Sequence, residues 1–198
     1  MKKYELTDET IEIGRKTLRR IRALRNFRDV KQGDLGGYIQ KEDNLSHHGN
    51  CWIGGHAKVY DDAKVYENAR VYGYAHVHDN SRIYGKAEVF DEARVYGRAE
   101  VYGDAYICGE PHIFDNAEVY GNAQVYEEPY IYDRARVYGN AQVYGDAHVY
   151  GDAHVYGDAH VYGDAHVYGH AKIYGEVCVC WNDWIDDDRR ISTREKTR

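Results

Sequence analysis

Residues 143–174 read VYGDAHVYGDAHVYGDAHVYGDAHVYGHAKIY, a six-residue unit that repeats almost without change. Outward from this stretch, every sixth position from Ile53 to Ile185 is Val or Ile, which gives 23 such positions. Two residues before each of them stands a small residue, which is Ala in most units. The consensus unit is therefore Ala-x-Val-Tyr-Gly-Asp.

This unit predicts a short strand followed by a corner. In the alternation Ala-x-Val, the Ala and Val side chains point to one side and their neighbours to the other. Gly followed by Asp or Asn is typical of turns. Strands this short do not pair as hairpins, but they can pair with the strands of the coils above and below. The sequence therefore predicts an all-β parallel β-helix, in which each buried Val or Ile contributes roughly 1.5–3 kcal/mol.

A second period, three units long, fixes the number of sides. The segment 110–115 (EPHIFD) recurs as 128–133 (EPYIYD), which would place the two prolines in one corner column. One further register with the same period carries Asp61, Asp79, Asp115 and Asp133. Because 18 residues hold three units, we predict a three-sided prism of seven to eight coils, about 35 Å tall at about 4.8 Å per coil.

The irregular ends predict capping segments, which repeat proteins need. We expect residues 1–50 to form an N-terminal cap, residues 51–185 the β-helix, and residues 186–198 a charged, solvated tail. Residues 15–31 carry a net charge of about +7, although the whole chain carries −7. The overall charge disfavours nucleic acid as a partner. A solvated face of the cap is the favoured interpretation of the basic stretch, with binding of anions as the alternative.

The chain contains no apolar run that would serve as a signal peptide or cross a membrane. Its four cysteines do not have the spacing of a disulfide framework. We therefore expect a cytoplasmic protein without a membrane partner.

The pattern in residues 149–154 (VYGDAH) resembles the hexapeptide repeat of the left-handed β-helix superfamily. This resemblance implies a left-handed coil and a homotrimer. It also implies a function, because the superfamily contains acyltransferases that bind acyl-CoA in a groove between prisms.

A closer resemblance extends upstream of the repeats, over residues 24–53. There the chain is similar to the lead-in of the YdcK-like bacterial transferases, whose label is inferred from their fold. The matching features are the stretch 29–31 (DVK), Gly33, Gly36-Gly37, Asn44 and Leu45 before Ser46, and Gly49-x-Cys51-Trp52-Ile53.

Tyrosine follows the buried aliphatic residue in most units, so each side of the prism should carry a ladder of rings. Such rings can shield the sheet by cross-strand stacking. They can also form a contact surface for other copies of the chain, a protein partner or a carbohydrate. We take Tyr132, Tyr150 and Tyr168 as candidate binding residues on one face.

The position before the aliphatic residue supplies the candidate catalytic groups. The 18-residue register places His148 beside His166, on the same face as Tyr150 and Tyr168. A histidine can act as the general base of an acyltransferase. These histidines belong to near-identical units, however, and duplication of the repeat also explains them.

A metal site is the weaker interpretation of the last coils. Cys178 and Cys180 flank Val179, with His160 one coil earlier, and these side chains suit zinc or copper. Paired thiols near a chain end are a weak signal, so we predict no metal site.

The uniform repeats favour a structural or interaction protein that presents flat Tyr-lined faces to a partner or to other copies of itself. A protein of this kind requires no cofactor. The alternative is a hexapeptide-repeat acyltransferase that transfers an acyl group from acetyl-CoA or another acyl-CoA to a hydroxyl or amine. The 23 units contain no inserted loop to build an active site, which counts against the alternative.

Overall fold

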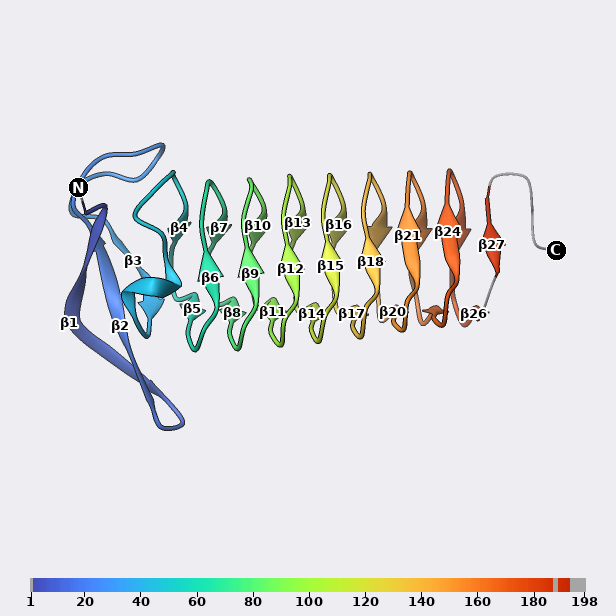
Figure 1. Ribbon diagram of the computed structural model, residues 1–198, viewed down its shortest axis with the longest axis horizontal. Helices are drawn as coiled ribbons and strands as arrows, with labels where there is room; N and C mark the ends of the chain where they lie inside the picture. Colours follow the sequence, from blue (N-terminus) through green and yellow to red (C-terminus); the bar gives the residue numbers. More distant parts are fainter. Residues whose placement is uncertain (1, 187–188, 193–198) are drawn as a thin grey trace.

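The computed structural model describes residues 2–186 and 189–192. Their coils are stacked along the long axis of the molecule, and a hairpin lies at the N-terminal end (Figure 1). Each coil contributes one strand to each of three sheets, and strands three units apart are parallel neighbours. His148 pairs with His166 and Val149 with Val167, for example. The predicted parallel β-helix with three sides and three units per coil is confirmed, whereas its handedness stays a prediction.

Sheet 1 has eleven strands and includes the N-terminal hairpin. Its strands are β1 (Tyr4–Ile13), β2 (Lys16–Ala23), β3 (Leu35–Ile39), β5 (Lys58–Val59), β8 (His76–Val77), β11 (Arg94–Val95), β14 (His112–Ile113), β17 (Tyr130–Ile131), β20 (His148–Val149), β23 (His166–Val167) and β26 (Trp184–Ile185).

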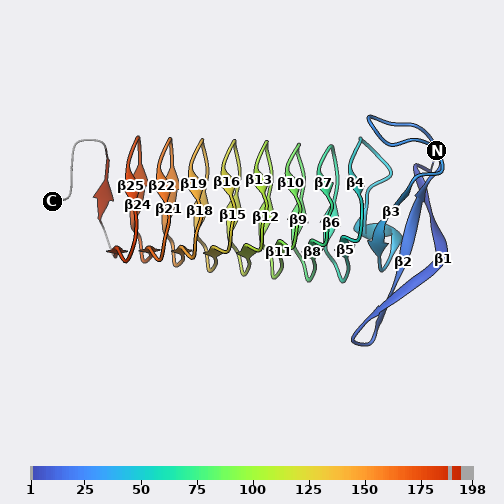
Figure 2. The ribbon, with the colours of Figure 1, turned by 180° about the vertical axis from the view of Figure 1, so that it is seen from behind.

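Sheets 2 and 3 have eight strands each, so the helix has about eight coils. Figure 2 shows the strands of sheet 2 from behind. They are β4 (Trp52–Ile53), β7 (Arg70–Val71), β10 (Glu88–Val89), β13 (Tyr106–Ile107), β16 (Gln124–Val125), β19 (Gln142–Val143), β22 (His160–Val161) and β25 (Cys178–Val179). Sheet 3 comprises β6 (Lys64–Val65), β9 (Arg82–Ile83), β12 (Glu100–Val101), β15 (Glu118–Val119), β18 (Arg136–Val137), β21 (His154–Tyr156), β24 (Lys172–Tyr174) and β27 (Arg190–Ile191).

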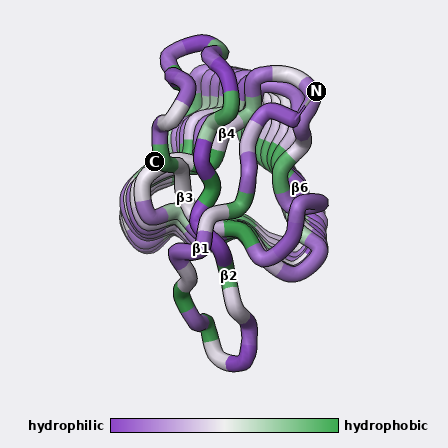
Figure 3. The backbone as a smooth tube through the Cα atoms, turned by 90° about the vertical axis from the view of Figure 1, so that its left-hand side faces the viewer, coloured by the Kyte–Doolittle hydropathy of each residue, from purple (hydrophilic) through white to green (hydrophobic). Residues whose placement is uncertain are grey.

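The core fills the interior of the prism, which Figure 3 shows along the coil axis. Every aliphatic residue of the repeat from Ile53 to Val179 is at most 1% exposed, and the Ala residues two positions earlier are buried with them. Backbone hydrogen bonds join successive coils, as where the Tyr150 N–H donates to the Val167 carbonyl at 2.9 Å. Burial of the Ala and Val side chains and hydrogen bonds between parallel strands therefore both stabilise each coil.

The corners need a backbone conformation with positive φ, two residues after each aliphatic residue. Gly takes this position in most units, while Asp, Glu or, after Val179, Trp181 takes it in others with φ of 56–66°. Pro111 and Pro129 lie in one corner column, because their carbonyls accept hydrogen bonds from strands one coil earlier. The proline column predicted from the spacing of three units is therefore present.

The N-terminal end begins with an antiparallel hairpin of β1 and β2, joined by a short turn at Gly14, whose φ is 60°. The hairpin extends beyond the cross-section of the coils (Figure 3). Strand β3 is antiparallel to β2 and parallel to β5, so it joins the hairpin to the first coil.

The first coil is longer than the others and begins before residue 51. Ile39 pairs with Val59, and Leu45 forms a bridge with Val65, so each pair spans two residues more than a regular coil does. Ile53 pairs with Val71, which restores the regular spacing. The two extra residues fall after the 3-10 helix η1 (Glu42–Asn44), in the loop that leads into β4.

The helix also continues past the predicted end at residue 185. Ile191 comes six residues after Ile185 and pairs with Ile173, so β27 extends the hexad pattern into the stretch assigned to the tail. The charged residues around Ile191 hid this last position from the sequence analysis. Residues 187–188 and 193–198 of the predicted tail lie outside the described residues.

Part of the basic stretch 15–31 is paired with acidic side chains of the cap. Arg20 and Arg22 on β2 form ion pairs with Glu9 and Glu5 on β1. Lys16 forms a third pair, with Asp61 of the first coils. These ion pairs hold the basic strand β2 against β1 and against the first coils.

Candidate functional site

The outer face of sheet 1 carries a continuous column of rings at the position after each buried aliphatic residue. Successive ring centroids are 4.9–5.2 Å apart, and their planes lie within 10° of parallel. This spacing follows the distance between strands, so the stack is a direct product of the parallel register. The column consists of Tyr60, His78, Tyr96, Phe114, Tyr132, Tyr150 and Tyr168.

A second column lies beside the first, at the position before the aliphatic residue. Its rings are His112, Tyr130, His148, His166 and Trp184, with centroids 3.9–4.9 Å apart. The two columns meet edge to face, as where Tyr150 and His166 lie 6.2 Å apart at 89°. We call the surface that these two columns form the aromatic face.

All five candidate residues of the sequence analysis lie on this aromatic face. Tyr132, Tyr150 and Tyr168 are consecutive in the first column. His148 and His166 are stacked in the second, with centroids 4.7 Å apart. The structure thus brings the candidate binding and catalytic residues together, while their roles stay predictions.

Interior rings of the aromatic face are half-buried and have another ring on each side. A ligand therefore meets ring edges and hydroxyl groups before it meets a full ring face. Trp184 differs, because it ends the second column among the described residues and is 56% exposed. The flat stacking surfaces expected from the tyrosine ladders are thus mostly occupied by the neighbouring rings.

The environment of the two histidines keeps them neutral. Burial lowers the pKa of His148, and the neighbouring His166 lowers it further. Burial also lowers the pKa of His166, whose Nδ1 is buried without a hydrogen-bond partner among the described residues. A neutral imidazole can accept a proton, but a lowered pKa makes it a weaker base at neutral pH.

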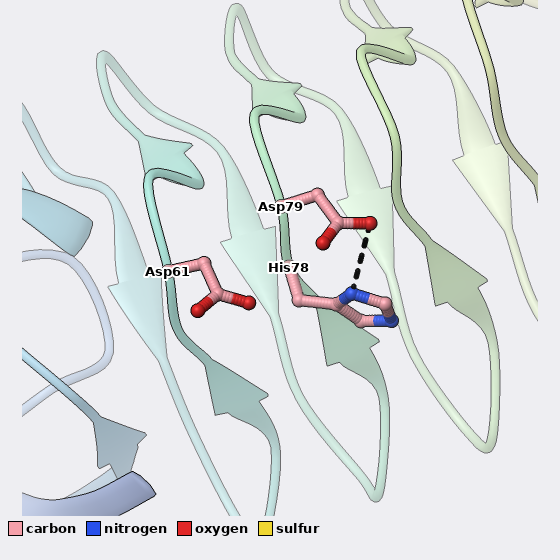
Figure 4. A group of neighbouring side chains, drawn as sticks. All are labelled: Asp61, His78 and Asp79. Carbon is pink, nitrogen blue, oxygen red and sulfur yellow. Dashed lines mark ion pairs between the residues drawn. The ribbon is translucent and has the colours of Figure 1, made fainter.

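The Cys178 and His160 residues are register partners on sheet 2, as the sequence predicted. Within the described ranges, however, the three-residue group with metal-ligand geometry is another one, Asp61, His78 and Asp79, whose ligand atoms all lie within 4.8 Å (Figure 4). The spacing of the repeats did not predict this group. The signal was present, since His78 replaces tyrosine in its column beside the register of aspartates.

Both carboxylates of this group already have partners. Asp61 Oδ2 accepts a hydrogen bond from Lys16 Nζ at 2.6 Å, and Asp79 Oδ2 accepts one from the Gly97 N–H at 3.0 Å. His78 Nδ1 lies 3.3 Å from the same Asp79 oxygen. The Lys16 ammonium thus compensates Asp61, and this ion pair joins the hairpin to the coils.

A cavity of about 500 Å³ lies at the N-terminal end of sheet 3, where η1 and the following loop adjoin β6. We call it the end pocket. The residues that line it include Glu42, Leu45, Ser46, His47, Lys64 and Tyr66. The repeat pattern did not predict this pocket, although the interval of eight residues between Leu45 and Ile53 marks the irregular coil.

His47 is the polar centre of the end pocket. Its Nδ1 accepts the backbone N–H of Lys3 at 3.2 Å, and its ring stacks on Tyr4 at 4.4 Å. Its Nε2 is buried without a hydrogen-bond partner among the described residues and lies 3.7 Å from Glu42 Oε2. Burial lowers the pKa of His47, so the ring is a neutral Nε2–H donor at physiological pH.

None of the helices in the described part of the chain combines the length and apolar character needed to cross a membrane.

Comparison with known proteins relates these coils to one repeat type. The family model described as the YdcK beta solenoid repeat matches residues 63–79, 131–145 and 141–157. The uncharacterized acetyltransferase YdcK of Escherichia coli (strain K12) is 43% identical over 61 residues, which cover 27% of this chain and 19% of the relative. The matched region spans about a fifth of that relative's length. The matched coils are therefore similar to the YdcK beta solenoid repeat, and the chain is a β-solenoid repeat protein.

Proposed function

We infer that this protein has a structural or interaction role, in which the aromatic face of one copy packs against that of another. The observation that carries this proposal is the pair of interlocked ring columns on a single side of the prism. Tyr and Trp are enriched at the energetic centres of protein interfaces, because they bury a large area at a small entropic cost. The exposed Trp184 lies at one end of this surface.

The shape of the aromatic face favours a second copy as the partner. Its rings repeat at the strand spacing, so a face of the same kind matches it in period. The buried aliphatic residues behind the rings hold both columns in place, so little order has to be created on binding. A homotrimer built around such faces agrees with the resemblance to the hexapeptide-repeat superfamily.

The test is the oligomeric mass in solution, measured by sedimentation equilibrium. We expect the wild-type protein to associate and the double variant Tyr150→Glu/Tyr168→Glu to remain monomeric. The matched control is Tyr144→Glu/Tyr162→Glu, which changes the same hexad positions on sheet 2, where Tyr144 and Tyr162 stack in the same way. A wild-type monomer at high concentration, or equal loss of association in both variants, would refute the proposal.

Acyl transfer is the second candidate function, and the name of the similar acetyltransferase from Escherichia coli supports it. Under this alternative an acyl-CoA is the cofactor, and His148 or His166 removes the proton from the acceptor hydroxyl or amine. Calorimetric titration with acetyl-CoA tests it. Binding that is weakened in His148→Gln/His166→Gln would favour acyl transfer, whereas no heat of binding at millimolar acetyl-CoA would exclude it.

A further inference from the structure

Sheet 3 carries the longest unbroken ladder of tyrosines in the described residues. Successive centroids are 4.8–5.1 Å apart, and the planes lie within 9° of parallel. Its members are Tyr66, Tyr84, Tyr102, Tyr120, Tyr138, Tyr156 and Tyr174. Each interior ring has a neighbour on both sides, so only the first and last rings can receive another ring.

At the N-terminal end of this ladder, Ser46 occupies the place of the next tyrosine. The Ser46 N–H donates to the Val65 carbonyl at 2.9 Å, as the Tyr66 N–H donates to the Ile83 carbonyl at 3.1 Å. The bridge between Leu45 and Val65 confirms this register. A serine side chain has no ring, so the outer side of Tyr66 borders the end pocket instead of another aromatic group.

The end pocket is suited to the group that the ladder lacks there. Tyr66 borders the pocket beside the strand residues Leu45 and Val65, whose side chains point into the core, and the volume of about 500 Å³ exceeds that of a bicyclic ring. His47 supplies the polar contact. Since its Nδ1 accepts the Lys3 N–H, the proton of the neutral ring is on Nε2, whose neighbouring acceptor Glu42 Oε2 lies 3.7 Å away, beyond a good hydrogen-bond distance.

We propose that the end pocket binds a small planar heteroaromatic ring, which stacks on Tyr66 and accepts a hydrogen bond from His47 Nε2–H. The ring continues the tyrosine ladder by one step at the strand spacing. A buried donor without an acceptor is unfavourable, so a ligand with a ring nitrogen gains more from His47 than a hydrocarbon of the same shape does. The site is on a different sheet from the aromatic face and does not depend on self-association.

Benzimidazole and indole are the matched probes, because they share a bicyclic shape but only benzimidazole carries an acceptor nitrogen. Binding is followed by chemical-shift changes in ¹H–¹⁵N spectra, with cyclohexanol as a non-planar control. We expect benzimidazole to bind with shifts confined to the end pocket, indole to bind more weakly and cyclohexanol not to bind. Absence of binding by benzimidazole at millimolar concentration would overturn the proposal.

Two variants test the stacking position. Ser46→Tyr places a ring of the protein itself over Tyr66, so it should abolish benzimidazole binding while the melting temperature is maintained. Tyr66→Leu removes the stacking surface and should weaken binding roughly 5- to 150-fold. Tyr174→Leu, at the other end of the same ladder, is the control and should leave binding unchanged. Unaltered binding in Tyr66→Leu would refute stacking even if Ser46→Tyr does not fold.

A third variant tests the hydrogen bond separately from the stacking. His47→Phe retains a ring against Tyr4 but removes the Nε2–H. We expect this variant to bind benzimidazole and indole equally. A preserved preference for benzimidazole would show that His47 is not the donor.

Discussion

The Gly151 N–H donates a hydrogen bond to Asp133 Oδ2, 3.0 Å away on the preceding coil. Asp133 adopts the positive φ of 58° that the corner needs. Its carboxylate also accepts a hydrogen bond from the corner N–H of the next coil. The same bond joins other acidic corners to the glycines one coil later, in the pairs Glu67–Gly85, Asp79–Gly97, Asp91–Gly109 and Glu127–Gly145.

This relationship predicts an unusual order of substitutions at Asp133. Asp133→Ala keeps a Cβ at positive φ and loses the bond, so it should lower the free energy of unfolding by about 1–3 kcal/mol. Asp133→Gly loses only the bond and should be the milder change, although glycine is usually the more destabilising residue. Urea unfolding of both variants gives the comparison, and a less stable Gly variant would contradict this account of the corner.

Close packing of the cap predicts that Gly37 cannot accept a side chain. A Cβ at this position would lie 2.5 Å from the Ala57 carbonyl oxygen and 2.7 Å from Ile53 Cγ2. Gly37→Ala should therefore destabilise the protein by at least about 1–3 kcal/mol, because backbone of the first coil must move. Gly54→Ala is the control, since its Cβ would have no contact closer than 3.6 Å. Equal melting temperatures of the two variants would contradict the prediction.

The fully buried Lys3 predicts a dependence of stability on pH. Its Nζ donates to the Cys51 carbonyl at 2.7 Å and lies 3.1 Å from Cys51 Sγ. Burial lowers the pKa of Lys3 from its ordinary 10.5. A lysine with a lowered pKa in the folded state destabilises the fold at low pH, and stability returns as the pH rises toward 10.5.

The comparison that isolates Lys3 is the variant Lys3→Met. As the pH rises from 7 toward 10.5, the wild-type protein should gain stability relative to this variant, in which Cys51 is unchanged. The gain should not exceed about 1.4 kcal/mol per pH unit, the limit for one proton. Denaturant unfolding at several pH values measures it, and parallel stability curves would contradict the prediction.

His76 predicts a loss of stability in acid. Its Nε2 lies 3.1 Å from Lys58 Nζ, and burial, Lys58 and Arg94 lower the pKa of His76 to about 4. Because the folded-state pKa lies below the ordinary 6.5, its contribution is complete above pH 6.5 and is lost as the pH falls toward 4.

The variant His76→Gln keeps an acceptor for Lys58 but does not titrate. Between pH 6.5 and pH 4, the wild-type protein should lose roughly 1–2 kcal/mol more than this variant, a figure reduced for the partial exposure of the side chain. The other histidines are common to both proteins, so their effects cancel. An equal loss in both proteins, measured by urea unfolding, would show that His76 is not the source.

The repeat could be read from the sequence because its period is uniform. One regular spacing of three units determines which side chains are neighbours, so the pairing of His148 with His166 followed without any knowledge of packing. The direction in which each ring turns did not follow. It depends on side-chain rotamers, and these place successive rings against one another so that interior faces are largely occupied.

The features that the sequence did not predict lie where the period changes. The interval of eight residues from Leu45 to Ile53 creates both the long first coil and the end pocket. A pattern defined by a spacing of six residues does not include this interval. Ile191 keeps the period, but its charged neighbours have the composition of a solvated tail. Contacts between distant segments, such as that of Lys3 with Cys51, have no signal in a periodic pattern.

The three-unit coil also governs how the molecule can change its length. An insertion or deletion of one whole coil moves every later side chain by one strand spacing, about 4.8 Å, and leaves it on the same side of the prism. A change of a single unit instead rotates everything downstream by one side, so that His166 would leave the aromatic face. Gene duplications of whole coils can therefore lengthen the molecule and keep each residue on its side of the prism. Duplication of a single unit instead moves every later residue to a different side.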